Sequence, residues 1–89
     1  MNVQLSLLDG IVATLPTRIC LSRVDPARRM ARFYVLAIEP TLFGGYALVR
    51  EYGRIGRGGR VVSKLYGSAD EAIQAFQRQR QVKERRGYA

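Results

Sequence analysis

Arginines, glycines and one aromatic residue crowd into a single short stretch, YGRIGRGGR, which runs from Tyr52 to Arg60. The arginine guanidinium is permanently charged, and its fork of N–H donors matches the oxygens of a phosphate. Glycine permits positive φ and a close approach of the backbone, and exposed N–H groups in such turns form concave anion sites. A tyrosine ring beside them offers a flat face to a sugar or base. The stretch predicts contact with a phosphate backbone through Tyr52, Gly53, Arg54, Arg57 and Arg60.

A purely structural interpretation of the same stretch remains open. It can be a long hairpin connection with incidental arginines, in which Tyr52 is a core or edge aromatic and Ile55 fills the core. The glycine spacing matches neither the dinucleotide-binding fingerprint nor a Walker A motif, which requires Lys-Ser/Thr after its last glycine. The stretch is therefore not expected to bind a nucleotide cofactor.

The charge of the whole chain also favours a polyanionic partner. Fifteen basic residues against seven acidic ones give a net charge of +8 on 89 residues, and thirteen of the fifteen are arginines. The alternative is that arginine enrichment reflects only a GC-rich genome and a hydrated surface. Both lysines, Lys64 and Lys83, are added to the predicted binding residues, although Lys83 also fits a solvated helix end. Arg28, Arg29 and Arg32 either extend the basic patch or belong to a solvated turn.

The residue types give little support for catalysis or metal binding. The chain has no histidine and a single cysteine, Cys20, which is expected to be a small buried strand residue. No two carboxylates are spaced for acid–base work. We expect a protein that is not an enzyme and uses no cofactor or metal. With one cysteine and no apolar run long enough to span a bilayer, a cytoplasmic location is expected.

Four segments have the alternation and the branched or aromatic composition of β-strands: 18–24, 32–39, 46–52 and 60–66. The intervening segment 26–32, PARRMAR, is expected to be a basic loop. Ser68 followed by Glu71 forms a capping box, which predicts a helix from Ala69 to about Arg85. Gly87 is placed to end it.

Sequential strands with short connections predict an α+β fold, in which an antiparallel β-sheet meander of four or more strands carries one C-terminal helix packed on one face. Residues 18–89 form the expected domain. Residues 1–17 fit either an extra edge element or a loosely held arm.

Several motifs together resemble the WGR domain. They are RFYVLAIEPTLFGGYALVREYGRIGRGGR, then SADEAIQAF, then VKERRGY, and they cover about residues 18–88 in the order and spacing of that family. The family's central Trp-Gly-Arg is Tyr52-Gly53-Arg54 here, since the chain has no tryptophan. A tyrosine keeps a flat ring with less stacking area. The sequence is similar to standalone bacterial members of the family.

The resemblance implies a nucleic-acid-binding module, with DNA favoured over RNA and with the binding role on Tyr52, Gly53 and Arg54. In DNA-dependent poly(ADP-ribose) polymerases the domain binds near a DNA break, close to the terminal nucleotide. Since no element suited to a major groove is evident, contact is expected with the duplex backbone, ends or single strands, largely independent of sequence.

The competing hypothesis is a protein-interaction accessory module. It would use an exposed sheet edge or the N-terminal arm, and it predicts an apolar patch that includes Leu5, Leu7, Leu8 or Leu42-Phe43. A monomer is favoured over an edge-strand homodimer, and no membrane partner is expected.

Overall fold

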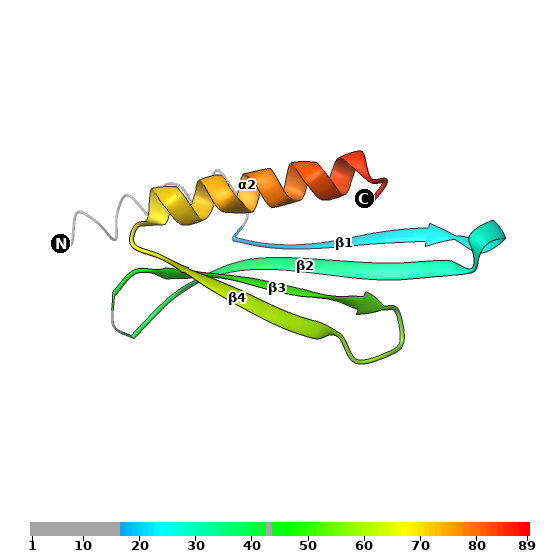
Figure 1. Ribbon diagram of the computed structural model, residues 1–89, viewed down its shortest axis with the longest axis horizontal. Helices are drawn as coiled ribbons and strands as arrows, with labels where there is room; N and C mark the ends of the chain where they lie inside the picture. Colours follow the sequence, from blue (N-terminus) through cyan, green and yellow to red (C-terminus); the bar gives the residue numbers. More distant parts are fainter. Residues whose placement is uncertain (1–16, 43) are drawn as a thin grey trace.

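The computed structural model describes residues 17–42 and 44–89, and it forms a four-stranded sheet with one long helix (Figure 1). The elements in chain order are β1 (Arg18–Asp25), the 3-10 turn η1 (Pro26–Arg28), β2 (Met30–Pro40), β3 (Tyr46–Arg54), β4 (Arg60–Tyr66) and α2 (Ala69–Arg85). Each strand pairs antiparallel with the next, in the order β1-β2-β3-β4. The predicted α+β meander is confirmed. The predicted N-terminal element, with Leu5, Leu7 and Leu8, and Phe43 lie outside the described residues.

Strand alternation explains which side chains form the core. Tyr34 and Leu36 of β2 and Tyr46 and Leu48 of β3 are buried on the face against which α2 lies. The helix meets them with the apolar stripe Ala72, Ala75 and Phe76. The core therefore lies between one face of the sheet and one side of α2.

The ends of α2 follow the predicted signals. Ser68 Oγ accepts a hydrogen bond from the Glu71 backbone N–H at 3.3 Å, and Gly87 takes a φ of 93° just beyond the helix. Tyr88 then packs against the core, and the Ala89 backbone exchanges two 2.9 Å hydrogen bonds with Ser22. The C-terminal residues thereby attach the end of α2 to strand β1.

Two strands are longer than predicted by two or more residues, and β1 is longer by one. β2 begins at Met30, so the expected basic loop over 26–32 is wrong, and only a tight turn remains there. Strand β3 continues through Arg54, so Tyr52-Gly53-Arg54 belongs to a strand and not to the glycine-rich loop. The two extensions support each other, because Arg32 pairs with Arg54 in the ladder and the Ile55 N–H donates to the Ala31 carbonyl at 2.9 Å.

Two burial predictions are wrong. Cys20 is exposed, because alternation along β1 places it on the face of the sheet opposite α2. Ile55 does not fill the core and is 47% exposed, since it follows the last paired residue of β3. None of the helices in the described ranges is long and apolar enough to cross a membrane.

Candidate nucleic-acid interface

A basic groove lies between the C-terminal half of α2 and strands β2 and β3. It joins a cavity of about 510 Å³ near the η1 turn and a cavity of about 380 Å³ farther along the helix. Tyr52 and Lys83 line both cavities. The basic groove is defined by the cations and tyrosines of this lining: Arg28, Arg29, Arg32, Tyr34, Arg50, Tyr52, Arg54, Lys83, Arg86 and Tyr88.

The floor of the basic groove is a cluster of three tyrosines. The rings of Tyr34 and Tyr52, paired across β2 and β3, stack with centroids 5.9 Å apart and an interplanar angle of 19°. Tyr88 meets the Tyr34 ring edge-on at 6.2 Å. The Tyr34 hydroxyl donates to Gln79 Oε1 of α2 at 3.3 Å. Because Tyr34 is buried and held on both sides, it supports the ring of the half-buried Tyr52.

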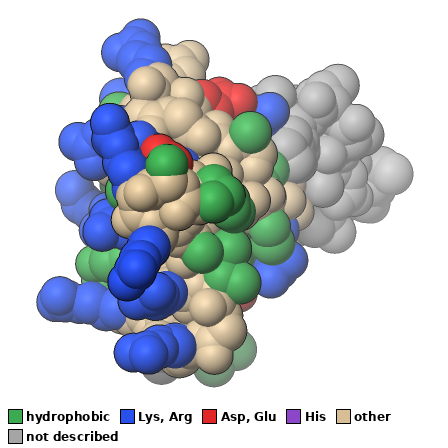
Figure 2. Space-filling view, turned by 90° about the vertical axis from the view of Figure 1, so that its right-hand side faces the viewer, with side chains coloured by type: hydrophobic (Ala, Val, Ile, Leu, Met, Phe, Trp, Pro, Cys, Tyr) green, Lys and Arg blue, Asp and Glu red, His purple; other side chains and the backbone are tan. Residues whose placement is uncertain are grey.

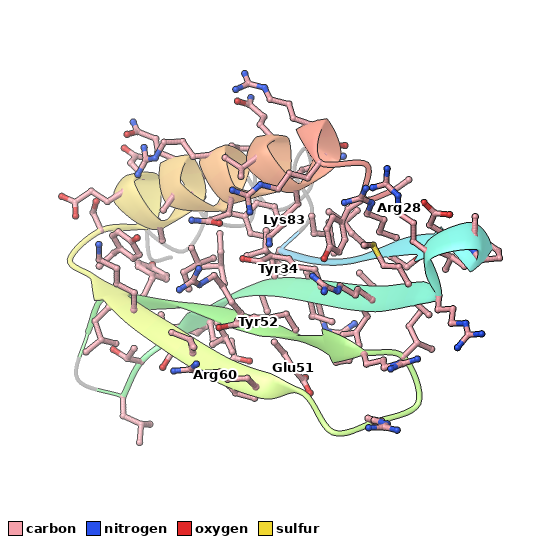
Figure 3. All side chains as sticks on the ribbon, turned by 45° about the vertical axis from the view of Figure 1, so that its right-hand side comes forward. Arg28, Tyr34, Glu51, Tyr52, Arg60 and Lys83 are labelled. Carbon is pink, nitrogen blue, oxygen red and sulfur yellow. The ribbon has the colours of Figure 1, made fainter. Side chains whose placement is uncertain are left out.

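Lys83 reaches from α2 across these rings, as Figure 3 shows. Its Nζ lies 4.5 Å from the centroid of Tyr34 and 5.3 Å from that of Tyr88, within the range of cation–π attraction. Burial lowers the pKa of Lys83 below its usual value, and the neighbouring charges of Arg86, Arg50 and Arg32 lower it further. An anion in the basic groove would relieve this repulsion among four cations.

The sequence-predicted residues divide into two groups in space. Tyr52, Gly53, Arg54 and Lys83 line the larger cavity together, although Lys83 is some thirty positions away in the chain. The others lie on or near β4, outside the basic groove. Arg60 pairs with Tyr52 in the ladder, Arg57 is in the turn of the β3–β4 hairpin, and Lys64 Nζ lies 5.5 Å from the Tyr66 ring centroid.

The glycines of the hairpin have mainly structural roles. A Cβ on Gly59 would lie 2.6 Å from Phe33 Cζ, and one on Gly53 would lie 3.4 Å from Phe33 Cε1. Gly59 therefore makes room for the Phe33 ring on the face opposite α2, whereas the tightest neighbour of a Cβ on Gly53 would be the Gly59 Cα, at 3.1 Å. Of the four glycines from Gly53 to Gly59, Gly56 is the one with positive φ, at 86°. The Phe33 ring explains why a glycine is needed at position 59, and the close approach of the Gly59 backbone explains the glycine at position 53.

Sequence reasoning did not place Tyr34, Arg50 and Arg86 in the site. Strand alternation puts Arg50 on the same face as Tyr52, and this pattern in the sequence could have placed Arg50 in the site. Tyr34 lies in a strand that is apolar on both faces, so alternation in the sequence does not show which face it occupies. Arg86 comes beside Lys83 because α2 ends over this part of the sheet. Arg28, Arg29 and Arg32 do line the larger cavity, as the patch interpretation expected.

No group of three or more His, Cys, Asp or Glu side chains that could hold a metal ion occurs within residues 17–42 and 44–89. Figure 2, a view from the end with the β1–β2 turn and the β3–β4 hairpin, shows Lys and Arg side chains gathered along one side of the molecule. The described site is thus a cationic and aromatic surface.

A meander backed by one helix, with an aromatic-Gly-Arg motif on its third strand, defines a small domain of one known class. Residues 17–89 match the family model of the WGR domain, and the chain belongs to this family. WGR domains are generally nucleic-acid-binding modules. The chain is 38% identical over 80 residues to the uncharacterized protein y4dW of Sinorhizobium fredii (strain NBRC 101917 / NGR234). That match covers 90% of this chain and 39% of the relative, so the chain spans about two fifths of the relative's length. No solved structure matches.

Proposed function

We propose that this chain binds DNA in preference to RNA, through the basic groove and the adjoining segment from Tyr52 to Arg60. The observation that carries the proposal is the position of Tyr52 and Lys83, which line both cavities, with arginines of β2 and β3 and Arg86 just beyond α2 around them. A nucleic-acid backbone supplies closely spaced phosphates for these cations, and a sugar or base supplies a flat partner for Tyr52.

The expected contacts are with the backbone and ends of the nucleic acid, and not with base edges. Helix α2 packs its apolar stripe on the sheet and ends at the basic groove, so it is not presented as a recognition helix. In the polymerases that share this domain, the motif binds near a DNA break. The placement of Tyr52, Gly53 and Arg54 in the larger cavity supports a similar role here.

We also propose that binding occurs without catalysis, in the cytoplasm and without a cofactor. No carboxylate or histidine of the described residues lines the two cavities, so the cations of the basic groove have no neighbour there that would move protons. Asp25 Oδ2 lies 3.6 Å from Arg28 Nε, in a surface ion pair at the η1 turn. Gel analysis of DNA after long incubation with the protein is expected to show unchanged strands. Cleaved or modified strands, absent with the Arg54→Ala variant, would refute this part of the proposal.

The test is a fluorescence-anisotropy titration at two salt concentrations. It compares an open-ended DNA duplex, the same duplex closed by hairpins at both ends, a single strand and an RNA duplex. The tightest binding is expected for the open-ended DNA. Equal, salt-sensitive binding to all four would reduce the site to a general polyanion surface, and no binding at low salt would overturn the proposal.

Variants connect the binding to the site. Arg54→Ala is expected to weaken binding by about three- to tenfold, as for the loss of one phosphate contact. Arg78→Ala on the exposed side of α2 is the matched control and is expected to bind normally, since Arg78 lines neither cavity. Unchanged binding in both Arg54→Ala and Tyr52→Ala would remove the proposed site.

A protein-interaction role has one observation in its favour. Leu42, in the turn between β2 and β3, is 97% exposed, and it lies at the end of the sheet away from the η1 turn. A partner held there would be retained in a pull-down after nuclease treatment and lost with Leu42→Ser. Loss of every partner on nuclease treatment would contradict this second role.

A further inference from the structure

The sheet has a second face, opposite α2, that is mostly apolar and that no described element covers. We call it the open face. Val61 and Leu65 on this face are 61% and 74% exposed, and Cys20 is exposed as well. By the strand register, the apolar positions near the middle of the open face are Cys20, Val35, Ala37, Val49, Val61 and Leu65, and the polar Ser63 lies between Val61 and Leu65 on β4. An exposed apolar sheet face of this kind marks a contact surface.

Charge is distributed very unevenly between the two faces. The arginines at 23, 32, 50, 54 and 60 all alternate onto the side that faces α2. On the open face the strands carry one cation, Arg18, and two carboxylates, Glu39 and Glu51. In a chain with a net charge of +8, the open face is therefore the surface on which two copies repel each other least.

Arg18 and Glu51 lie symmetrically about the middle of the open face. Arg18 is aligned across the ladder with Ala37, and Glu51 is aligned with Val35. The two charged residues are on β1 and β3, strands that lie about 10 Å apart across the sheet with β2 between them. The point midway between them falls on β2 between Val35 and Ala37.

Neither charge takes part in an ion pair within residues 17–42 and 44–89. Arg18 donates from Nη1 to Cys20 Sγ at 3.3 Å, a weak contact for a guanidinium. Glu51 points away from α2, as Figure 3 shows. One cation and one carboxylate on a mostly apolar face thus have the arrangement of a self-complementary surface.

We propose that the open face binds a second copy of this chain, sheet against sheet. The two-fold axis lies in the interface between the two sheets and passes over β2 between Val35 and Ala37. A two-fold axis makes the contact reciprocal, so Arg18 of each copy meets Glu51 of the other. The apolar side chains between the two ion pairs are buried as in a β-sandwich, where sheets pack about 10 Å apart.

This arrangement leaves both basic grooves on the outside of the dimer, because α2 and the open face are on opposite sides of the sheet. Dimerisation therefore does not compete with nucleic acid. The sequence alone favoured a monomer and considered only pairing through an edge strand. The register of all four strands was needed to bring Arg18 and Glu51 to one face.

The test is sedimentation velocity of the full chain without nucleic acid, at protein concentrations from about 1 to 500 µM, a range that brackets typical weak-to-moderate affinities. The mass is expected to rise from 10.0 kDa to twice that value. Arg18→Glu and Glu51→Arg are each expected to raise the dimer Kd at least about tenfold, since each brings like charges together. The double variant is expected to restore the Kd to within about threefold of the original.

Arg78→Glu makes the same change of charge on the exposed side of α2 and is expected to leave the Kd unchanged. The Cys20 thiol gives a second readout, because its reaction with a thiol reagent is expected to slow as the dimer forms. Circular dichroism of each variant confirms that it is folded before its Kd is compared.

Three results would overturn the proposal. They are a full chain that stays monomeric over the whole concentration range, single variants that dimerise normally, and a double variant that is not rescued. A monomer with a slow-reacting Cys20 thiol would indicate that another part of the same chain covers the open face. A dimer whose Kd is unchanged by Arg18→Glu and by Glu51→Arg would place the contact on an edge strand.

Discussion

Tyr52, at the position of the family's tryptophan, both packs against the core and lines the basic groove. Its ring stacks on buried Tyr34 and so belongs to the packed side of the sheet. The same residue lines both cavities of the basic groove and so remains accessible to a ligand. The two interpretations that the sequence left open, core aromatic and stacking platform, are therefore compatible.

Tyr52→Ala is expected to weaken binding to open ends and single strands by about tenfold, since stacking of one base on an aromatic ring contributes about 1–3 kcal/mol. Closed-duplex affinity should change less. Anisotropy on the three DNA forms measures this, and Tyr52→Trp serves as the conservative control that keeps a flat ring. An equal loss on all three forms would assign Tyr52 a packing role alone.

Lys83 is expected to make binding sensitive to alkaline pH. Its pKa is lowered in the free protein, so its positive charge is lost at a lower pH than that of an ordinary lysine. Since a phosphate binds the protonated form, affinity falls as the pH rises through this lowered pKa, by up to about tenfold per pH unit. Lys83→Arg keeps its charge and should flatten the profile. Identical pH profiles for the two proteins would exclude Lys83 from the contact.

At the scale of elements, the β3–β4 hairpin is shaped by its packing against Phe33 of β2. Gly59 accepts the Phe33 ring from β2, and the backbones of Gly53 and Gly59 approach closely at the end of β3 that carries Tyr52 and Arg54. Gly53 and Gly59 thus pack on the open face, while Tyr52, Arg54 and Arg60 alternate onto the other face.

Gly59→Ala is expected to lower the stability by about 1–3 kcal/mol, the usual cost of overpacking, because its Cβ would lie 2.6 Å from Phe33 Cζ and 3.1 Å from Glu51 Cγ. Gly58→Ala is the matched control, since nothing lies within 4 Å of its Cβ and its φ is not positive. It should be neutral or slightly stabilising. Urea denaturation measures the stability of both variants. Equal stabilities would show that the packing of the Phe33 ring does not require a glycine at position 59.

The whole molecule is electrically polarised along its strands. The η1 turn, the β3–β4 hairpin and the end of α2 lie at one end and carry most of the arginines of the basic groove. Glu39, Asp70 and Glu71 are near the other end, where β2 ends and α2 begins. Such a polarised molecule approaches a polyanion with its basic end first.

Binding is therefore expected to fall steeply with salt. If about four phosphates are neutralised, affinity should drop about 100-fold between 50 and 200 mM salt through counterion release. Arg54→Ala should reduce the slope of log affinity against log salt by about one. Titrations at four salt concentrations give the slopes, and a slope near zero would contradict phosphate binding as the main source of affinity.

The sequence by itself determined the strand and helix segments, the meander order and the family, because alternation, capping residues and motif order are local signals. It also singled out Tyr52, Gly53, Arg54 and Lys83, which the fold does bring together. Only the tertiary structure decided that the motif is strand and that Cys20 and Ile55 are exposed. The ends of β2 and β3 depend on their pairing with each other, and exposure depends on which face α2 covers. For the same reason, the grouping of Tyr34, Arg50 and Arg86 around Lys83 could not come from the sequence, since residues on three different elements meet there only when the helix packs on the sheet.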